Sequence, residues 1–135
     1  MRAGDRRYRF DPRTGFAVQD WGRGMWPYRS FWNWGVATGW AGDVLLGVNF
    51  GAKWTTGTGS NENGILWNGR LHKVMEDLRW DYDASSWRKP WRVVAEHSGA
   101  LDLVLEPVAA HTPRMNLGVL ATGGVCAFGT WRGHV

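Results

Sequence analysis

The chain has 135 residues, of which 44% are apolar and 21% are charged. This length and composition suit one globular domain with its own core, and they exclude a disordered chain. The single cysteine excludes an intramolecular disulfide framework. The chain also contains eleven tryptophans, an unusually large number, so the aromatic side chains are the feature that a functional account must explain.

The N-terminal part of the chain is basic and polar. Seven of the thirteen arginines lie within the first 29 residues, where three aspartates interrupt them. No later stretch is basic enough to follow a phosphate backbone, so we expect no nucleic-acid partner despite the net charge of +4. The longest uncharged run, residues 115–131, is shorter than the roughly 20 residues of a membrane span. We predict a basic arm over residues 1–20, a domain over residues 21–135, no transmembrane segment and a cytoplasmic location.

The stretch GRGMWPYRSFWNWG, residues 22–35, gathers five aromatic residues where the first strand is expected. In a strand, Trp32 and Trp34 share one face, while Phe31 and Asn33 share the other. The rings suit a sheet core, the wall of a pocket for an apolar ligand, or a surface that stacks on sugars or bases. Gly35 and the flanking aliphatic residues favour buried rings over an exposed surface.

Alternating apolar residues and turn residues predict seven or eight antiparallel strands. They lie at 31–40, 43–51, 63–67, 70–75, 77–83, 91–97, 100–106 and 115–131, the last of which contains one strand or two. Asn68-Gly69, Ser98-Gly99 and Gly123-Gly124 are predicted to be hairpin turns. Pro107 is expected to end its strand because proline has no N–H to donate. The sequence therefore predicts an all-β antiparallel meander, either a barrel or a sandwich.

The first two predicted strands, SFWNWGVATGW and DVLLGVNFGAKW, are apolar on both faces. A barrel of about eight strands has an interior that side chains fill or that holds one small ligand. Asn33 and Asn49 lie among these bulky residues, and buried amides need hydrogen-bond partners, which a ligand can provide. We therefore expect a hydrophobic small molecule as the partner, with Asn33, Asn49 or Glu62 orienting its polar end.

Few residues suggest catalysis. The glycine-rich stretch at 57–64 lacks the spacing of a phosphate-binding loop, and the four histidines are too far apart to indicate a metal site. Glu62 is flanked by two amides and lies either at a solvated loop tip or at a pocket rim. His72 is either a structural histidine or a general acid or base. Cys126 is expected to be a small core residue. No cofactor is expected.

A succession of motifs over residues 16–133 resembles the bacterial family called domain of unknown function 2804. The motifs are DWGRGMWPYRSFWNWG, GVNFGAKWTTGTGSNENG, GRLHKVMEDLRWDYD, PWRVV, LDLVLEP and FGTWRG. The matching positions are Arg23, Trp26, Pro27, Tyr28, Trp32, Trp34, Asn49, Gly51, Glu62, Asn63, Gly69, His72 and Lys73.

The resemblance implies a lipocalin-like calycin barrel, loosely related to carotenoid hydratases of the hydroxyneurosporene synthase type. It covers a central to C-terminal part of the family domain. The barrel is therefore expected to be partly open, with a sheet edge through which copies of the chain can form a homo-oligomer.

These observations predict a β-barrel that binds a hydrophobic small molecule in an aromatic-lined pocket. The predicted ligand-binding residues are Arg23, Trp26, Tyr28, Trp32, Asn33, Trp34, Asn49, Asn63 and Trp80. One alternative is an enzyme for acid-assisted hydration or cyclisation of an isoprenoid-like substrate, with Glu62 or His72 as the proton donor. A second alternative is a carbohydrate-binding module, which requires at least one exposed ring.

Overall fold

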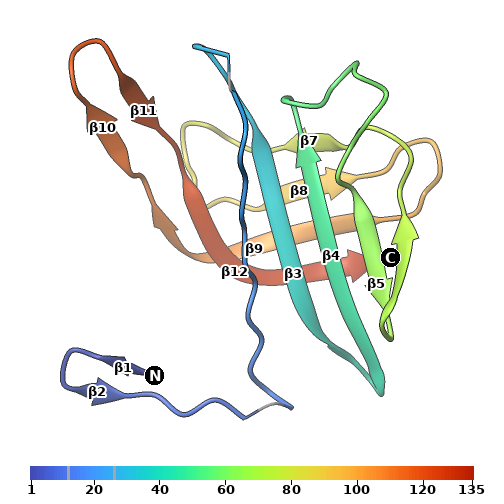
Figure 1. Cartoon of the computed structure of the whole chain (residues 1–135). Coiled ribbons are helices and arrows are strands. Elements are labelled where there is room, and N and C mark those ends of the chain that lie inside the picture. Colours follow the sequence, from blue (N-terminus) through green and yellow to red (C-terminus); the bar gives the residue numbers. More distant parts are fainter. Residues whose placement is uncertain (12, 26) are drawn as a thin grey trace.

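The computed structural model describes residues 1–11, 13–25 and 27–135, and these ranges contain strands and no helix. Eight of the strands form two four-stranded antiparallel sheets, and four short strands form two separate hairpins (Figure 1). The all-β antiparallel prediction is therefore confirmed. No helix in the described part of the chain is long and apolar enough to cross a membrane.

The first sheet has the order β3-β4-β5-β6. Its strands are β3 (Asn33–Ala41), β4 (Val44–Ala52), β5 (Gly64–Trp67) and β6 (Arg70–Lys73). Each strand pairs with the next along the chain, as the alternating pattern predicts. Asn68 and Gly69 both have positive φ, 45° and 80°, so this Asn-Gly pair forms the predicted tight turn between β5 and β6.

The second sheet has the order β12-β9-β8-β7. Its strands are β7 (Arg79–Asp81), β8 (Trp91–Val94), β9 (Asp102–His111) and β12 (Cys126–His134). The prediction that Pro107 ends its strand is wrong, because β9 continues through it to His111. Beyond Leu105, β9 pairs only with β12, and the register between them shifts at Phe128 and Gly129. This bulge accommodates the proline.

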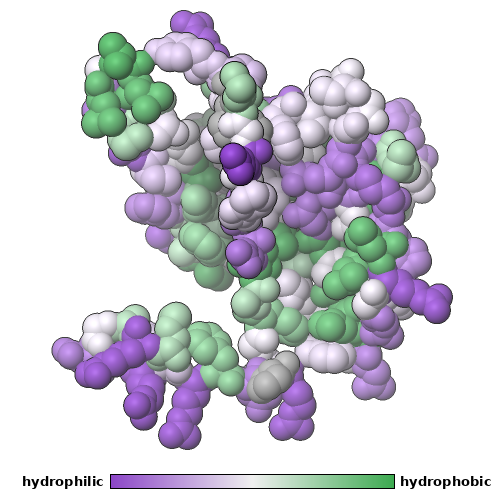
Figure 2. All heavy atoms as spheres, in the orientation of Figure 1, coloured by the Kyte–Doolittle hydropathy of each residue, from purple (hydrophilic) through white to green (hydrophobic). Residues whose placement is uncertain are grey.

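The remaining strands form hairpins at the periphery. They are β1 (Arg2–Ala3), β2 (Arg6–Arg7), β10 (Arg114–Asn116) and β11 (Ala121–Gly123). The hairpin turn predicted at Gly123-Gly124 is wrong, because Gly123 pairs with Arg114 inside the β10–β11 ladder. The tip of this hairpin lies at residues 117–120, where the N–H of Leu117 donates to the carbonyl of Leu120 at 2.8 Å. Figure 2 shows the apolar tip standing out from the body.

The core lies between the two sheets, whose strands cross in Figure 1. Phe50 of β4 is fully buried, and Trp80 and Trp131 from the second sheet meet its ring edge-on, with centroids 5.4 and 5.1 Å away. Such aromatic side chains each bury enough apolar surface to contribute about 2–3 kcal/mol. The buried cluster comprises Val48, Phe50, Ile65, Val74, Leu78, Val93, Ala95, Leu101 and Leu103.

The sheets do not join into a closed barrel in the part of the chain that the structure describes. β3 is the outer strand of the first sheet and β12 is the outer strand of the second, and among the described residues each pairs with one neighbour only. A closed barrel is therefore not found among these residues, and the calycin barrel, expected to be closed or partly open, stays a prediction. The backbones of β3 and β12 retain free edges.

Candidate functional site

A groove of about 2020 Å³ lies between β3 and β12, and every residue of both strands lines it. Pockets for drug-sized ligands usually have about 300–1,000 Å³, so this groove is larger than such a ligand needs. The groove follows from the two free strand edges, which meet no partner strand in the described part of the chain.

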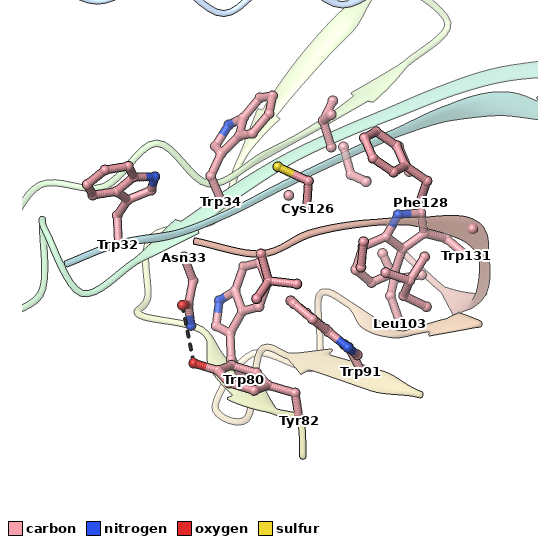
Figure 3. Close-up of a pocket in the computed structure, with 18 of the residues that line it drawn as sticks. Trp32, Asn33, Trp34, Trp80, Tyr82, Trp91, Leu103, Cys126, Phe128 and Trp131 are labelled. Carbon is pink, nitrogen blue, oxygen red and sulfur yellow. Dashed lines mark hydrogen bonds between the residues drawn. The ribbon is translucent and has the colours of Figure 1, made fainter. Parts of the chain in front are cut away.

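The lining residues fall on two sides of the β3 and β12 ribbons (Figure 3). Asn33, Trp80, Tyr82, Trp91, Leu103 and Trp131 lie on one side, whereas Trp32, Trp34, Cys126 and Phe128 lie on the other. Trp32 and Trp34 thus point away from Asn33, as the period-two alternation predicts. We call the side with Asn33, which faces the core between the sheets, the inner side of the groove.

An aromatic cluster on the inner side joins the two sheets. Tyr82 follows β7, and its ring centroid lies 5.0 Å from that of Trp91 and 5.8 Å from that of Trp87. The Lys53 ammonium donates to the Tyr82 hydroxyl at 2.9 Å, and this hydroxyl donates to Asn33 Oδ1 at 3.4 Å. Lys53 follows β4 and Asn33 begins β3, so these contacts connect one end of the first sheet with the second.

Asn49 and Glu62 belong to a different network, and neither of these two residues lines the groove. Trp34 Nε1 donates to Asn49 Oδ1 at 2.9 Å, and Asn49 Nδ2 donates to the Glu62 carbonyl at 2.9 Å and to its Oε2 at 3.4 Å. Trp54 Nε1 donates to Glu62 Oε1 at 3.0 Å. Gly51 leaves room for this carboxylate, since a Cβ at that position would displace the end of the Glu62 side chain.

Asn63 has a structural position. It is fully buried, its Oδ1 accepts from the Gly51 N–H at 2.8 Å, and its Nδ2 donates to the Glu76 carbonyl at 2.9 Å. Lys73 Nζ donates to the carbonyls of Asn61 and Asn63 at 2.8 and 2.9 Å. Burial lowers the pKa of Lys73 from its ordinary value. These contacts fix the 61–63 segment against β4 and leave Asn63 satisfied without a ligand.

The remaining predicted residues lie away from the groove or outside the described residues. His72 is exposed on β6, the outer strand of the first sheet. Arg23 and Tyr28 are exposed in the segment before β3, where the Tyr28 hydroxyl donates to the Val119 carbonyl at 2.5 Å. Trp26 lies outside the described residues. Of the predicted ligand-binding residues, those that line the groove are Trp32, Asn33, Trp34 and Trp80.

Two expectations about burial are wrong. Cys126 is exposed and lines the groove, because it begins β12 at a sheet edge and not in the core. The aromatic rings near β3 are also not buried: Trp32 is 61% exposed and Trp40 is 50% exposed. Trp32 and Cys126 both lie on the side of the β3 and β12 ribbons that points away from the core, which explains their exposure.

Several groove residues were not predicted. Lys53, Tyr82, Trp87, Trp91 and Trp131 all line the groove. The alternation that places Trp80 and Tyr82 on one strand face was visible in the sequence, but which strand they face depends on the pairing of distant segments. Among the described residues, no three His, Cys, Asp or Glu side chains are arranged to hold a metal ion.

Comparison with known protein families adds one finding. The family described as domain of unknown function (DUF2804) matches residues 1–135. Among curated proteins and among solved structures, none matches the chain.

Proposed function

The chain belongs to the DUF2804 family, and we propose that it binds a hydrophobic small molecule in the groove between β3 and β12. The observation that carries this proposal is the partial burial of three tryptophans on the inner side of the groove. Trp80, Trp91 and Trp131 line the groove and are only partly buried between the sheets. A ligand that covered these rings would remove a large apolar area from water, which favours binding.

We also propose that the two sheets correspond to an open lipocalin-like calycin barrel of a bacterial, cytoplasmic protein. The strand order supports the barrel, because β3 to β6 pair in chain order and β7, β8, β9 and β12 do the same, as in an up-and-down barrel. The free edges of β3 and β12 support pairing between two copies of the chain.

Intrinsic tryptophan fluorescence tests the binding proposal. We expect retinol, a neutral polyene, to quench the fluorescence saturably at about one molecule per chain after correction with free tryptophan. Trp91→Ala should weaken binding, because Trp91 lines the groove. Trp21→Ala is the matched control, because Trp21 is 76% exposed and does not line the groove. A cooperatively folded protein without saturable quenching, or equal loss in both variants, would contradict the proposal.

The geometry supports acid-assisted catalysis less well. Neither Glu62 nor His72 lines the groove, and both carboxylate oxygens of Glu62 accept hydrogen bonds. The enzyme alternative requires that Glu62→Gln abolish turnover of an isoprenoid-like substrate while binding persists. Unchanged turnover in this variant would remove Glu62 from the mechanism.

Carbohydrate binding is a second candidate, favoured by one observation. The rings of Trp34 and Trp54 are 37% and 48% exposed, and both indoles hydrogen-bond the Asn49–Glu62 network. Exposed rings beside polar groups suit stacking on a sugar. This candidate predicts that an insoluble glycan retains the protein and that Trp34→Ala abolishes retention. Absence of retention on all glycans tested would exclude it.

A further inference from the structure

The charges along the groove have one sign. In the part of the chain that the structure describes, the lining includes Lys53, Arg114, Arg132 and His134 but no aspartate or glutamate. Arg132 pairs with Glu106 at 2.9 Å, whereas Lys53 and Arg114 take part in no ion pair between described residues. A cleft lined by charges of one sign concentrates ligands of the opposite sign. The groove is therefore suited to an anion.

The hydrogen bonds around Tyr82 leave several N–H donors available. Lys53 Nζ donates to the Tyr82 hydroxyl, which in turn donates to Asn33 Oδ1. An ammonium group has three N–H donors and an amide nitrogen has two. Two N–H groups of Lys53 thus remain, and the Asn33 amide nitrogen donates to no protein group in the described residues. Free N–H donors that include a charged ammonium suit an anionic oxygen, because hydrogen bonds between ionised groups are the stronger ones.

The backbone conformation of Lys53 also points to a ligand site. Its φ is 78°, in the left-handed region where glycine is favoured, and its N–H donates to Thr56 Oγ1 at 3.1 Å. A lysine in this conformation carries a steric cost that glycine would avoid, and such strained residues cluster at ligand sites. The turn places the ammonium 5.6 Å from the centre of the Tyr82 ring, at the groove.

We propose that the ligand of the groove is an apolar carboxylic acid, bound as its carboxylate by Lys53 and Asn33. Its apolar body lies along the inner side, against Trp80, Leu103 and Trp131. The rings of Tyr82, Trp87 and Trp91 back the charged end and shield it from water on one side, which strengthens its hydrogen bonds. This inference rests on the proposed function and specifies the chemical class of its ligand.

Retinoic acid and retinol form a matched pair of probes, because they share one polyene body and differ only at the polar end. At neutral pH we expect the native protein to bind retinoate more tightly than retinol by about tenfold or more. Lys53→Met removes the charge and keeps the apolar stem, so it should abolish this preference. Arg88→Met removes one charge at an exposed residue outside the groove and should preserve it.

Asn33→Asp provides a second variant in case Lys53→Met does not fold. The added carboxylate should repel retinoate and weaken its binding far more than that of retinol, so the preference for retinoate should be lost. Equal affinity of the native protein for the two probes would overturn the inference and leave the proposed function intact. A preference for retinoate that survives in both folded variants would also overturn it. If the folded native protein binds neither probe, the proposed function fails as well.

Discussion

Gly35 shows how the absence of one methyl group shapes the core. A Cβ at this position would lie 2.2 Å from Cε2 of Phe50, whose ring is fully buried. Phe50 in turn meets the rings of Trp80 and Trp131, so it cannot move without disturbing both. Glycine in β3 therefore permits the aromatic layer that forms the floor of the groove.

Gly35→Ala should destabilise the fold, and Gly39→Ala should not do so to the same degree. Overpacking a buried ring costs about 1–3 kcal/mol of the free energy of unfolding. Gly39 is in the same strand, and a Cβ there would meet no atom within 4 Å. Urea unfolding of both variants measures the difference. Equal midpoints would contradict the close approach of β3 to Phe50.

Lys53 allows a separate test of its backbone conformation. Lys53→Ala and Lys53→Gly both remove the hydrogen bond to Tyr82, but only glycine adopts a φ of 78° without steric cost. Lys53→Gly should therefore be more stable to unfolding than Lys53→Ala by about 1 kcal/mol. If the alanine variant is equally stable, Lys53 is not held in the left-handed region.

At the scale of elements, Glu76 connects three segments. Its carboxylate accepts from the N–H groups of His97 and Ser98 at 2.8 and 2.9 Å, and its carbonyl accepts from Asn63. These bonds join the β6–β7 connection to the turn before β9 and to the loop before β5. The hydrogen bonds from Ser98 and His97 lower the pKa of Glu76 from its ordinary value.

This lowered pKa predicts a pH dependence of stability. The contribution of Glu76 is fully present above the pKa of the unfolded state, and it is lost as the pH falls through the lower pKa of the folded state. Glu76→Gln should lower the free energy of unfolding by about 1–2 kcal/mol at neutral pH and make the loss of stability in acid less steep. The exposed Asp77→Asn is the control. Parallel pH profiles for Glu76→Gln and the native protein would contradict the role of Glu76.

The elements that the sequence predicts well depend on local information. The strands of the first sheet and the Asn68-Gly69 turn follow from alternation and from φ preferences of adjacent residues. The errors at Pro107 and Gly123-Gly124 have another origin, because both positions depend on which strand lies alongside. Beyond Leu105, β8 no longer pairs with β9, so a proline is tolerated there. No local sequence pattern shows where the pairing with β8 ends.

At the scale of the whole molecule, the groove arises only when both sheets are in place. Alternation identified Trp32, Asn33, Trp34 and Trp80 as candidates, and all four line the groove. It could not identify Lys53, because its contact with Tyr82 spans 29 residues. Family-like motifs also indicated Asn49, Glu62 and Asn63, but these polar groups mainly satisfy one another and the backbone.

The central claim is that an apolar ligand binds on the inner side of the groove, and the indole N–H signals test it most directly. A ¹H–¹⁵N spectrum, assigned by single Trp→Phe variants, reports on each tryptophan separately. Adding retinol should shift the signals of Trp80, Trp91 and Trp131, and leave those of Trp21 and Trp54 in place, because these two do not line the groove. Shifts confined to Trp21 and Trp54, or unchanged signals at saturating retinol, would contradict the claim.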